Sequence, residues 1–130
     1  MAYLGEPGAF SQAAAKKVFG SWMIGVPCLC AEAVFEEVTG GKAAFAVIPI
    51  ENTLAGSIYQ NYDLLARHSL AVVAETSLRI AHNLIAHKGA DLRDIRQVYS
   101  HPAALEQCSR FLRRHRTLEK VPFYNTAGSV

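Results

Sequence analysis

The chain has 130 residues, of which 51% are hydrophobic, enough to bury the core of one compact domain or two small lobes. Its formal net charge of +2 is modest and its basic residues are scattered, which argues against a nucleic-acid-binding protein. No apolar run could span a bilayer and no charged leader precedes an apolar segment, so we expect a soluble cytoplasmic protein without a membrane partner.

Strand-like and helix-like segments alternate along the first half of the chain. Short β-branched or apolar runs are followed by segments with helical spacing, and Gly20 is placed to end the first helix. This alternation is typical of a parallel sheet with right-handed crossovers. We predict strands within residues 2–4, 21–30, 45–50 and 70–75, and helices at residues 10–19, 31–39 and 57–67.

The chain changes character at Thr76 and Ser77, and the residues after this point are most naturally interpreted as a second α/β lobe. We therefore divide the chain into residues 1–76 and 77–130. In the second part we predict strands at 78–86, 97–100 and 118–123, with a helix from 102 to 115.

Asn125 is a good N-cap residue, and residues 126–130 would form the first turn of its helix. One turn is too short for a helix to nucleate. We therefore expect the second lobe to be incomplete at its C-terminal end.

A buried-strand pattern in residues 45–50 leads directly into Glu51, Asn52 and Thr53. These polar residues would lie at the carboxyl end of a central strand, where open α/β sheets bind their ligands. An amphipathic helix is expected after Ala55 and Gly56, with Ile58, Tyr62 and Leu65 spaced along it. Its first amides could approach a ligand anion closely through those small residues.

Four strand-to-helix junctions of this kind occur, at residues 8–11, 55–57, 100–102 and 125–129. Pro102 suits a first helical position, and Ser100 or His101 can cap that helix. In a two-lobed fold the junctions would converge on one cleft. Helix N-termini with Ser and Thr hydroxyls favour a multiply anionic small molecule over a metal ion or a nucleic acid.

The three cysteines, Cys28, Cys30 and Cys108, form no Cys-x-x-Cys pair. We expect buried thiols that stay reduced in the cytosol. A zinc ion would need a further ligand from a histidine, and His82, His87 and His101 lie at no recognisable spacing. No metal site is therefore predicted.

Several segments resemble the prephenate dehydratase family, which includes the arogenate dehydratases. Residues 49–58, Pro-Ile-Glu-Asn-Thr-Leu-Ala-Gly-Ser-Ile, resemble its Pro-Ile-Glu-Asn-Ser/Thr signature. Residues 3–11 are similar to its N-terminal motif, residues 100–102 with Gln107 and Cys108 to its middle motif, and residues 125–129 to its Thr-Ala-Gly motif. Four segments in the family's order across the whole chain are a specific signal.

The resemblance implies a two-lobed α/β catalytic domain, similar to periplasmic binding proteins of the second type, with mostly parallel sheets flanked by helices. The lobes would be residues 1–76 and 77–130, with the closing segment and any regulatory domain absent. The implied activity is the decarboxylating dehydration of prephenate, a dianionic substrate, to phenylpyruvate in L-phenylalanine biosynthesis. It requires no metal or organic cofactor, and family members form homo-oligomers.

The resemblance also assigns site residues. Asn52, Ser100 and Gln107 match catalytic positions, and the substrate-binding positions are Glu51, Thr53, Gly56, Ser57, Thr126, Ala127, Gly128 and Ser129. The family's proton donor is usually taken to be the threonine of a Thr-Arg-Phe motif, which these 130 residues lack, so we expect the chain by itself to be inactive.

Alternatives remain for individual residues and for the substrate. Glu51 could be a solvated carboxylate, Asn52 and Thr53 could only shape a turn, and Gln107 could lie on the surface. Residues 61–65 are similar to a stretch that arogenate dehydratases often carry, which makes arogenate a second candidate substrate. A non-catalytic module that binds small anions is a third possibility. Ala103 replaces a glutamine common in the family, which puts the fine fit of the substrate in question.

Overall fold

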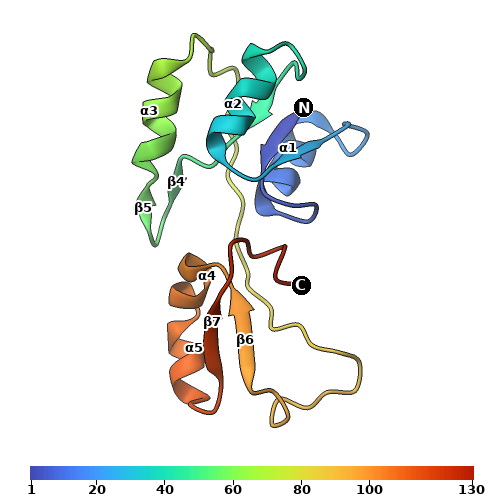
Figure 1. Ribbon diagram of the computed structural model, residues 1–130, viewed down its shortest axis with the longest axis vertical. Coiled ribbons are helices and arrows are strands. Elements are labelled where there is room, and N and C mark those ends of the chain that lie inside the picture. The colour runs from blue at the N-terminus through green and yellow to red at the C-terminus, as the bar shows by residue number, and fades with distance from the viewer. The chain divides into compact units, whose positions relative to one another are not determined.

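A computed structural model describes all 130 residues, and the chain folds into two compact units, Met1–Arg79 and Ile80–Val130 (Figure 1). In both units parallel strands are flanked by helices, which confirms an α/β fold. That these units are the lobes of a dehydratase domain stays a prediction. None of the helices is long and apolar enough to cross a membrane.

The first unit is built on a three-stranded parallel sheet with the order β2-β1-β3. Its elements are β1 (Ala2–Leu4), α1 (Phe10–Phe19), β2 (Val26–Cys28), α2 (Ala31–Thr39) and β3 (Ala46–Val47). Both helices contact β1, and the core consists of Ala2, Cys28, Val34 and Ala43. Helix α1 ends as predicted, because Gly20 has a φ of +91°, where a residue with a side chain would be strained.

The prediction of a central strand over residues 45–50 is wrong in length and in position. Strand β3 has only two residues and lies at the edge of the sheet, while β1 is central. Beyond β3 the backbone bonds elsewhere: the Pro49 carbonyl accepts from Asn61 Nδ2 at 2.7 Å, and the Ile50 carbonyl accepts from the Ile58 amide at 2.9 Å. Because Pro49 also has no amide hydrogen, the chain leaves the sheet there.

The polar segment after β3 forms an antiparallel hairpin of β4 (Glu51–Asn52) and β5 (Gly56–Ser57), followed by α3 (Tyr59–Arg67). The predicted helix start at residues 55–57 is therefore wrong, and the amides of Gly56 and Ser57 are not helix N-terminal amides. The buried residues of α3 are Asn61 and Leu64, not the predicted Ile58, Tyr62 and Leu65. Helix α3 contacts α2.

The second unit is a parallel pair of strands, β6 (Gln97–Ser100) and β7 (Glu119–Pro122), with a helical crossover. The predicted single helix is two helices, α4 (Pro102–Gln107) and α5 (Ser109–Arg114), because Cys108 has a φ of −89° and a ψ of 5°. Figure 1 shows both helices along one side of the strand pair. Leu105, Leu112 and Leu118 form the core between them.

The predicted strands at residues 70–75 and 78–86 pair with no neighbouring strand. Val72 and Val73 are 71% and 69% exposed. β-branched side chains favour an extended backbone, but a strand exists only where a neighbouring backbone completes its hydrogen bonds. Both predicted strands are therefore wrong, and residues 70–86 belong to no helix or strand.

Candidate functional site

The signature residues of the first unit lie on the β4–β5 hairpin. Glu51 pairs with Ser57 across the hairpin, and Asn52 pairs with Gly56. The Asn52 Oδ1 atom accepts from the amides of Leu54 at 2.9 Å and Ala55 at 3.2 Å. Asn52 therefore shapes the turn, as one alternative proposed. These bonds use only the oxygen, so they do not commit its Nδ2 donor.

The remaining hairpin residues face solvent. Asn52 is half-buried, whereas Glu51, Thr53, Gly56 and Ser57 are exposed. Gly56 has a φ of +83°, and a Cβ added there would meet no atom within 4 Å. A glycine is thus required by the backbone conformation alone. The hairpin presents two hydroxyls, one carboxamide and one carboxylate, a set suited to hydrogen-bonding a small polar ligand.

Asn61 supports the backbone that leads into the hairpin, and this role was not identified from the sequence. It is 3% exposed, and its Nδ2 atom donates to the carbonyl of Pro49, two residues before Glu51. Its own amide donates to the Ile58 carbonyl at 2.9 Å. The available signal was a polar residue three positions before Leu64, on the stripe that α3 buries.

In the second unit, Ser100 ends β6 directly before α4. Its carbonyl accepts from the Phe123 amide at 2.8 Å, and Ser100 pairs with Pro122 in the strand register. The His101 Nδ1 atom accepts from the Ala103 amide at 3.2 Å, and Pro102 occupies the start of the helix. Both predictions for this helix start are confirmed.

Asn125 makes the hydrogen bonds predicted for an N-cap, and residues 126–129 form a turn. Its Oδ1 atom accepts from the amides of Ala127 at 2.8 Å and Gly128 at 3.2 Å. The Ser129 hydroxyl donates to the Thr126 carbonyl at 2.7 Å. Two amides that were expected to bind an anion thus already donate to Asn125, and a ligand would have to compete with that carboxamide for them.

Gln107 is the last residue of α4, and it is half-buried rather than a solvated surface residue. Its Oε1 atom lies 2.6 Å from His82 Nε2. The sequence suggested no role for His82 other than that of a zinc ligand. The available signal was the alternation of Ile80, His82 and Leu84, which an extended backbone would place on one side together.

Two of the three thiols have a raised pKa. Burial raises the pKa of the Cys108 thiol beside Gln107. Burial, with smaller contributions from Glu37 and Cys30, likewise raises the pKa of the Cys28 thiol. Both therefore stay protonated near neutral pH. The expectation of a buried Cys30 is wrong, because this residue is the N-cap of α2 and is exposed.

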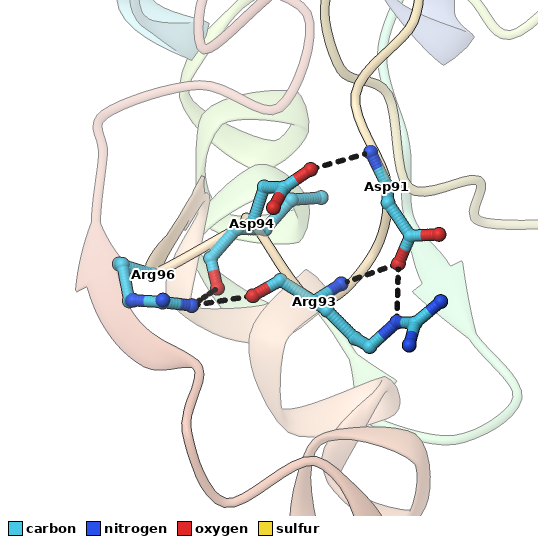
Figure 2. A network of polar contacts seen from close by, with 5 residues as sticks. Asp91, Arg93, Asp94 and Arg96 are labelled. Atoms are coloured by element: carbon cyan, nitrogen blue, oxygen red, sulfur yellow. Dashed lines mark hydrogen bonds and ion pairs between the residues drawn. The ribbon is translucent and has the colours of Figure 1, made fainter.

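A separate charged cluster lies in the loop before β6 (Figure 2). Asp91 Oδ1 accepts from the amide and the Nε atom of Arg93 at 2.9 Å and 3.1 Å, and Asp94 Oδ2 accepts from the Asp91 amide at 3.0 Å. Arg96 Nη1 donates to the Arg93 carbonyl. These side chains stabilise their own loop, so we assign the cluster no ligand.

Each unit thus brings together its own part of the predicted site. The first unit gathers Glu51, Asn52, Thr53, Gly56 and Ser57 on one hairpin. The second holds Ser100 and the turn at 125–129 at the same end of the β6–β7 pair, with Gln107 at the end of α4. Convergence of both parts on one cleft stays a prediction.

The family comparison decides where this chain belongs. The profile of the family described as prephenate dehydratase matches residues 1–130. The chain belongs to the prephenate dehydratase family. The four motifs that suggested this family therefore lie within a match that covers every residue of the chain.

Curated relatives carry both of the expected substrate names. The chain is 46% identical over 112 residues to arogenate dehydratase/prephenate dehydratase 2, chloroplastic, of Arabidopsis thaliana. It is 37% identical over 131 aligned positions to the bifunctional chorismate mutase/prephenate dehydratase of Pseudomonas aeruginosa. These alignments cover 86% and 100% of this chain, but only 29% and 36% of the two relatives. The chain thus spans about a third of the length of the curated relatives it matches.

Two solved structures share the fold over 98% of this chain. One, described as GqqA, a novel type of quorum quenching acylase, has a TM-score of 0.83 and 31% identity, with 46% of its chain covered. The other, a prephenate dehydratase from Arthrobacter aurescens in complex with L-Phe, has a TM-score of 0.77 and 30% identity, with 43% covered. One fold thus carries two differently described proteins, so a likeness of fold alone does not identify the reaction.

Proposed function

We propose that the protein containing these residues is a prephenate dehydratase, a lyase that converts prephenate to phenylpyruvate in L-phenylalanine biosynthesis. The observation that carries the proposal is the match of the family profile to the entire chain. The relatives named for prephenate and arogenate support it. The donors on the β4–β5 hairpin and at the start of α4 are suited to a dianionic substrate.

In this reaction the bond between the ring and its carboxylate breaks, and carbon dioxide leaves. The electron pair of that bond completes the aromatic ring as the ring hydroxyl departs, and one added proton converts that hydroxyl to water. The protein must orient the carboxylate and supply the proton, which positioned donors and dipoles can do. The proposed mechanism uses no metal ion and no organic cofactor.

The proposed catalytic residues are Asn52, Ser100 and Gln107, each with a polar hydrogen to donate to substrate oxygens. Their partners in substrate binding are Glu51, Thr53, Gly56, Ser57, Thr126, Ala127, Gly128 and Ser129. We propose that the two units are the lobes of one dehydratase domain. We also propose that the family threonine of Thr-Arg-Phe supplies the proton, so that the 130-residue chain alone is inactive.

Arogenate is the second candidate substrate, because several plant relatives are named arogenate dehydratases and share 44–46% identity with this chain. Its dehydration would give L-phenylalanine directly. A binding module without chemistry is the third candidate, because a fold that binds a small anion need not react with it. We propose a homo-oligomer in the cytoplasm, although several of the plant relatives are named chloroplastic.

The test is a coupled assay of the full-length protein with prephenate and with arogenate, in which phenylpyruvate is followed at alkaline pH and L-phenylalanine by chromatography. We expect turnover of prephenate, and faster turnover of arogenate would replace the first candidate by the second. Tight binding without turnover, measured by titration calorimetry, would favour the binding module. The 130-residue chain serves as the control, and its activity would contradict the assignment of the proton donor.

A further inference from the structure

His82 and Gln107 form the closest side-chain pair in the second unit's part of the site. The 2.6 Å contact joins His82 Nε2 to Gln107 Oε1, across 25 positions of sequence. Gln107 ends α4, whereas His82 lies in the part of the second unit before β6, outside any helix or strand. Both side chains are half-buried. The contact is therefore a tertiary one and does not arise from neighbouring residues of one helix.

The direction of this hydrogen bond depends on the tautomer of His82 and on which end of the Gln107 amide faces the ring. In the structure Gln107 Oε1 faces His82, and in this orientation the oxygen accepts and His82 Nε2 carries the hydrogen. An imidazole that is neutral with its hydrogen on Nε2 can donate this bond, and so can an imidazolium. The pairing therefore does not require a change in the charge of His82.

Gln107 can be turned in two ways, and these differ in what it offers a ligand. With Oε1 held by His82, the Nε2 group is turned away from the histidine and presents two N–H donors. With the amide reversed, an oxygen would face outward instead. A carboxylate or a departing hydroxyl is bound by donors and repelled by an oxygen.

We infer that His82 is a positioning residue that selects the donor-outward orientation of Gln107 for the anionic substrate. This inference rests on the proposed function and deepens it, because it explains how a flexible glutamine offers a fixed donor. A glutamine side chain has three rotatable bonds, and holding it in advance removes an ordering cost from substrate binding. His82 itself need not touch the substrate.

The test compares four single variants in the full-length protein. His82→Leu removes the donor and keeps bulk, and His82→Gln restores an N–H close to the position of His82 Nε2. We expect kcat/KM with prephenate to fall about tenfold in His82→Leu and to recover at least half of its value in His82→Gln. Gln107→Glu keeps an acceptor for His82 but turns an oxygen outward, so we expect a loss larger than in His82→Leu. His87→Leu is the matched control, because His87 is an exposed histidine five residues further on, and we expect it to be unchanged.

A double-mutant cycle separates positioning from a merely structural role. If His82 acts through Gln107, His82→Leu has no further effect in a Gln107→Ala background. Equal losses in both backgrounds would overturn the inference. Thermal melts identify a variant that fails to fold. If His82→Leu fails to fold, the activity of His82→Gln and NMR of the histidine ring decide whether His82 positions Gln107.

The NMR measurement does not depend on activity. In protein labelled with ¹⁵N-histidine, correlations of the ring show whether His82 Nε2 carries a hydrogen, and we expect that it does at neutral pH. A hydrogen only on Nδ1 would overturn the inference. Absence of turnover in the wild type with either substrate would instead overturn the proposed function, whereas an active wild type with additive variants would overturn only the role of His82.

Discussion

The two parts of the candidate site are held in place by different means. In the first unit a buried side chain, Asn61, fixes the backbone that leads into the β4–β5 hairpin. In the second unit, capping side chains nearer the surface, His101 and Asn125, fix the turns at residues 101–103 and 125–128. Loss of a buried donor leaves its partner without water, whereas an accessible amide can bond to solvent instead. Substitution of Asn61, which supports the hairpin, should therefore cost more stability than substitution of the capping residues.

The largest effect is expected at Asn61. Asn61→Leu leaves the Pro49 carbonyl without its buried donor, and we expect a loss of about 2 kcal/mol in the free energy of unfolding. Urea denaturation followed by circular dichroism measures this loss. Gln60→Leu is the matched control, one position earlier on the exposed side of α3. Equal losses in the two variants would contradict the claim that the buried hydrogen bond of Asn61 stabilises the fold.

The second-largest loss of stability is expected at Gly56, because its φ of +83° strains any residue with a side chain. Gly56→Ala is expected to cost about 1–2 kcal/mol, and Gly56→Asn less, since asparagine tolerates left-handed backbone. A Cβ would meet no atom within 4 Å, so crowding cannot explain a loss. Denaturation of both variants side by side gives the order, and a more stable alanine variant would contradict it.

The cap at Asn125 should be less sensitive. Asn125→Ala removes the acceptor for the amides of Ala127 and Gly128, and we expect a cost of about 1 kcal/mol confined to the second unit. Hydrogen exchange of peptides covering 123–130 is the measurement. Asn125→Ser retains a capping oxygen and should exchange close to the wild type, so equal exchange in both variants would show that the cap contributes nothing.

The smallest effect is expected in the loop of Figure 2. Hydrogen bonds from the Arg93 amide, and then from its side chain, hold the pKa of Asp91 below its ordinary value of 3.8. The folded state thus favours the ionised form. This stabilisation is present above the unfolded pKa and is lost as the pH falls through the lower folded pKa.

Asp91 is exposed, so solvent and salt screen its stabilising interactions with Arg93. We therefore expect only a small change in stability at acidic pH. Thermal melts between neutral pH and about pH 3 compare the wild type with Asp91→Asn, in which this titration is absent. We expect the difference between them to shrink as the pH falls. A difference that grows with acidity would have the wrong sign.

Local sequence signals identified much of the fold because they act over a few residues. Gly20 ended α1, and Pro102 with His101 started α4, since dihedral preferences and capping bonds need only near neighbours. The family motifs also named the residues that the hairpin and the helix starts present. The interruption of the helix at Cys108 was missed because no glycine or proline marks it.

The errors occurred where distant partners decide the outcome. Residues 45–50 have the pattern of a strand. The carbonyl of Pro49, however, accepts a hydrogen bond from the side chain of Asn61, twelve positions later, and the chain leaves the sheet there. Residues 70–75 have the composition of a strand without a neighbouring strand to pair with. The roles of Asn61 and His82 were missed for the same reason.

By itself the sequence determined the α/β class, the C-terminal end of the first helix, the capping residues and the family, because each depends on local geometry or on a motif contained in a few consecutive positions. Only the tertiary structure decided which backbones pair, that Glu51 and Ser57 share a hairpin, and that His82 holds Gln107. Those outcomes depend on atoms brought together across the chain, where a hydrogen bond or a buried side chain can outweigh what the neighbouring residues prefer.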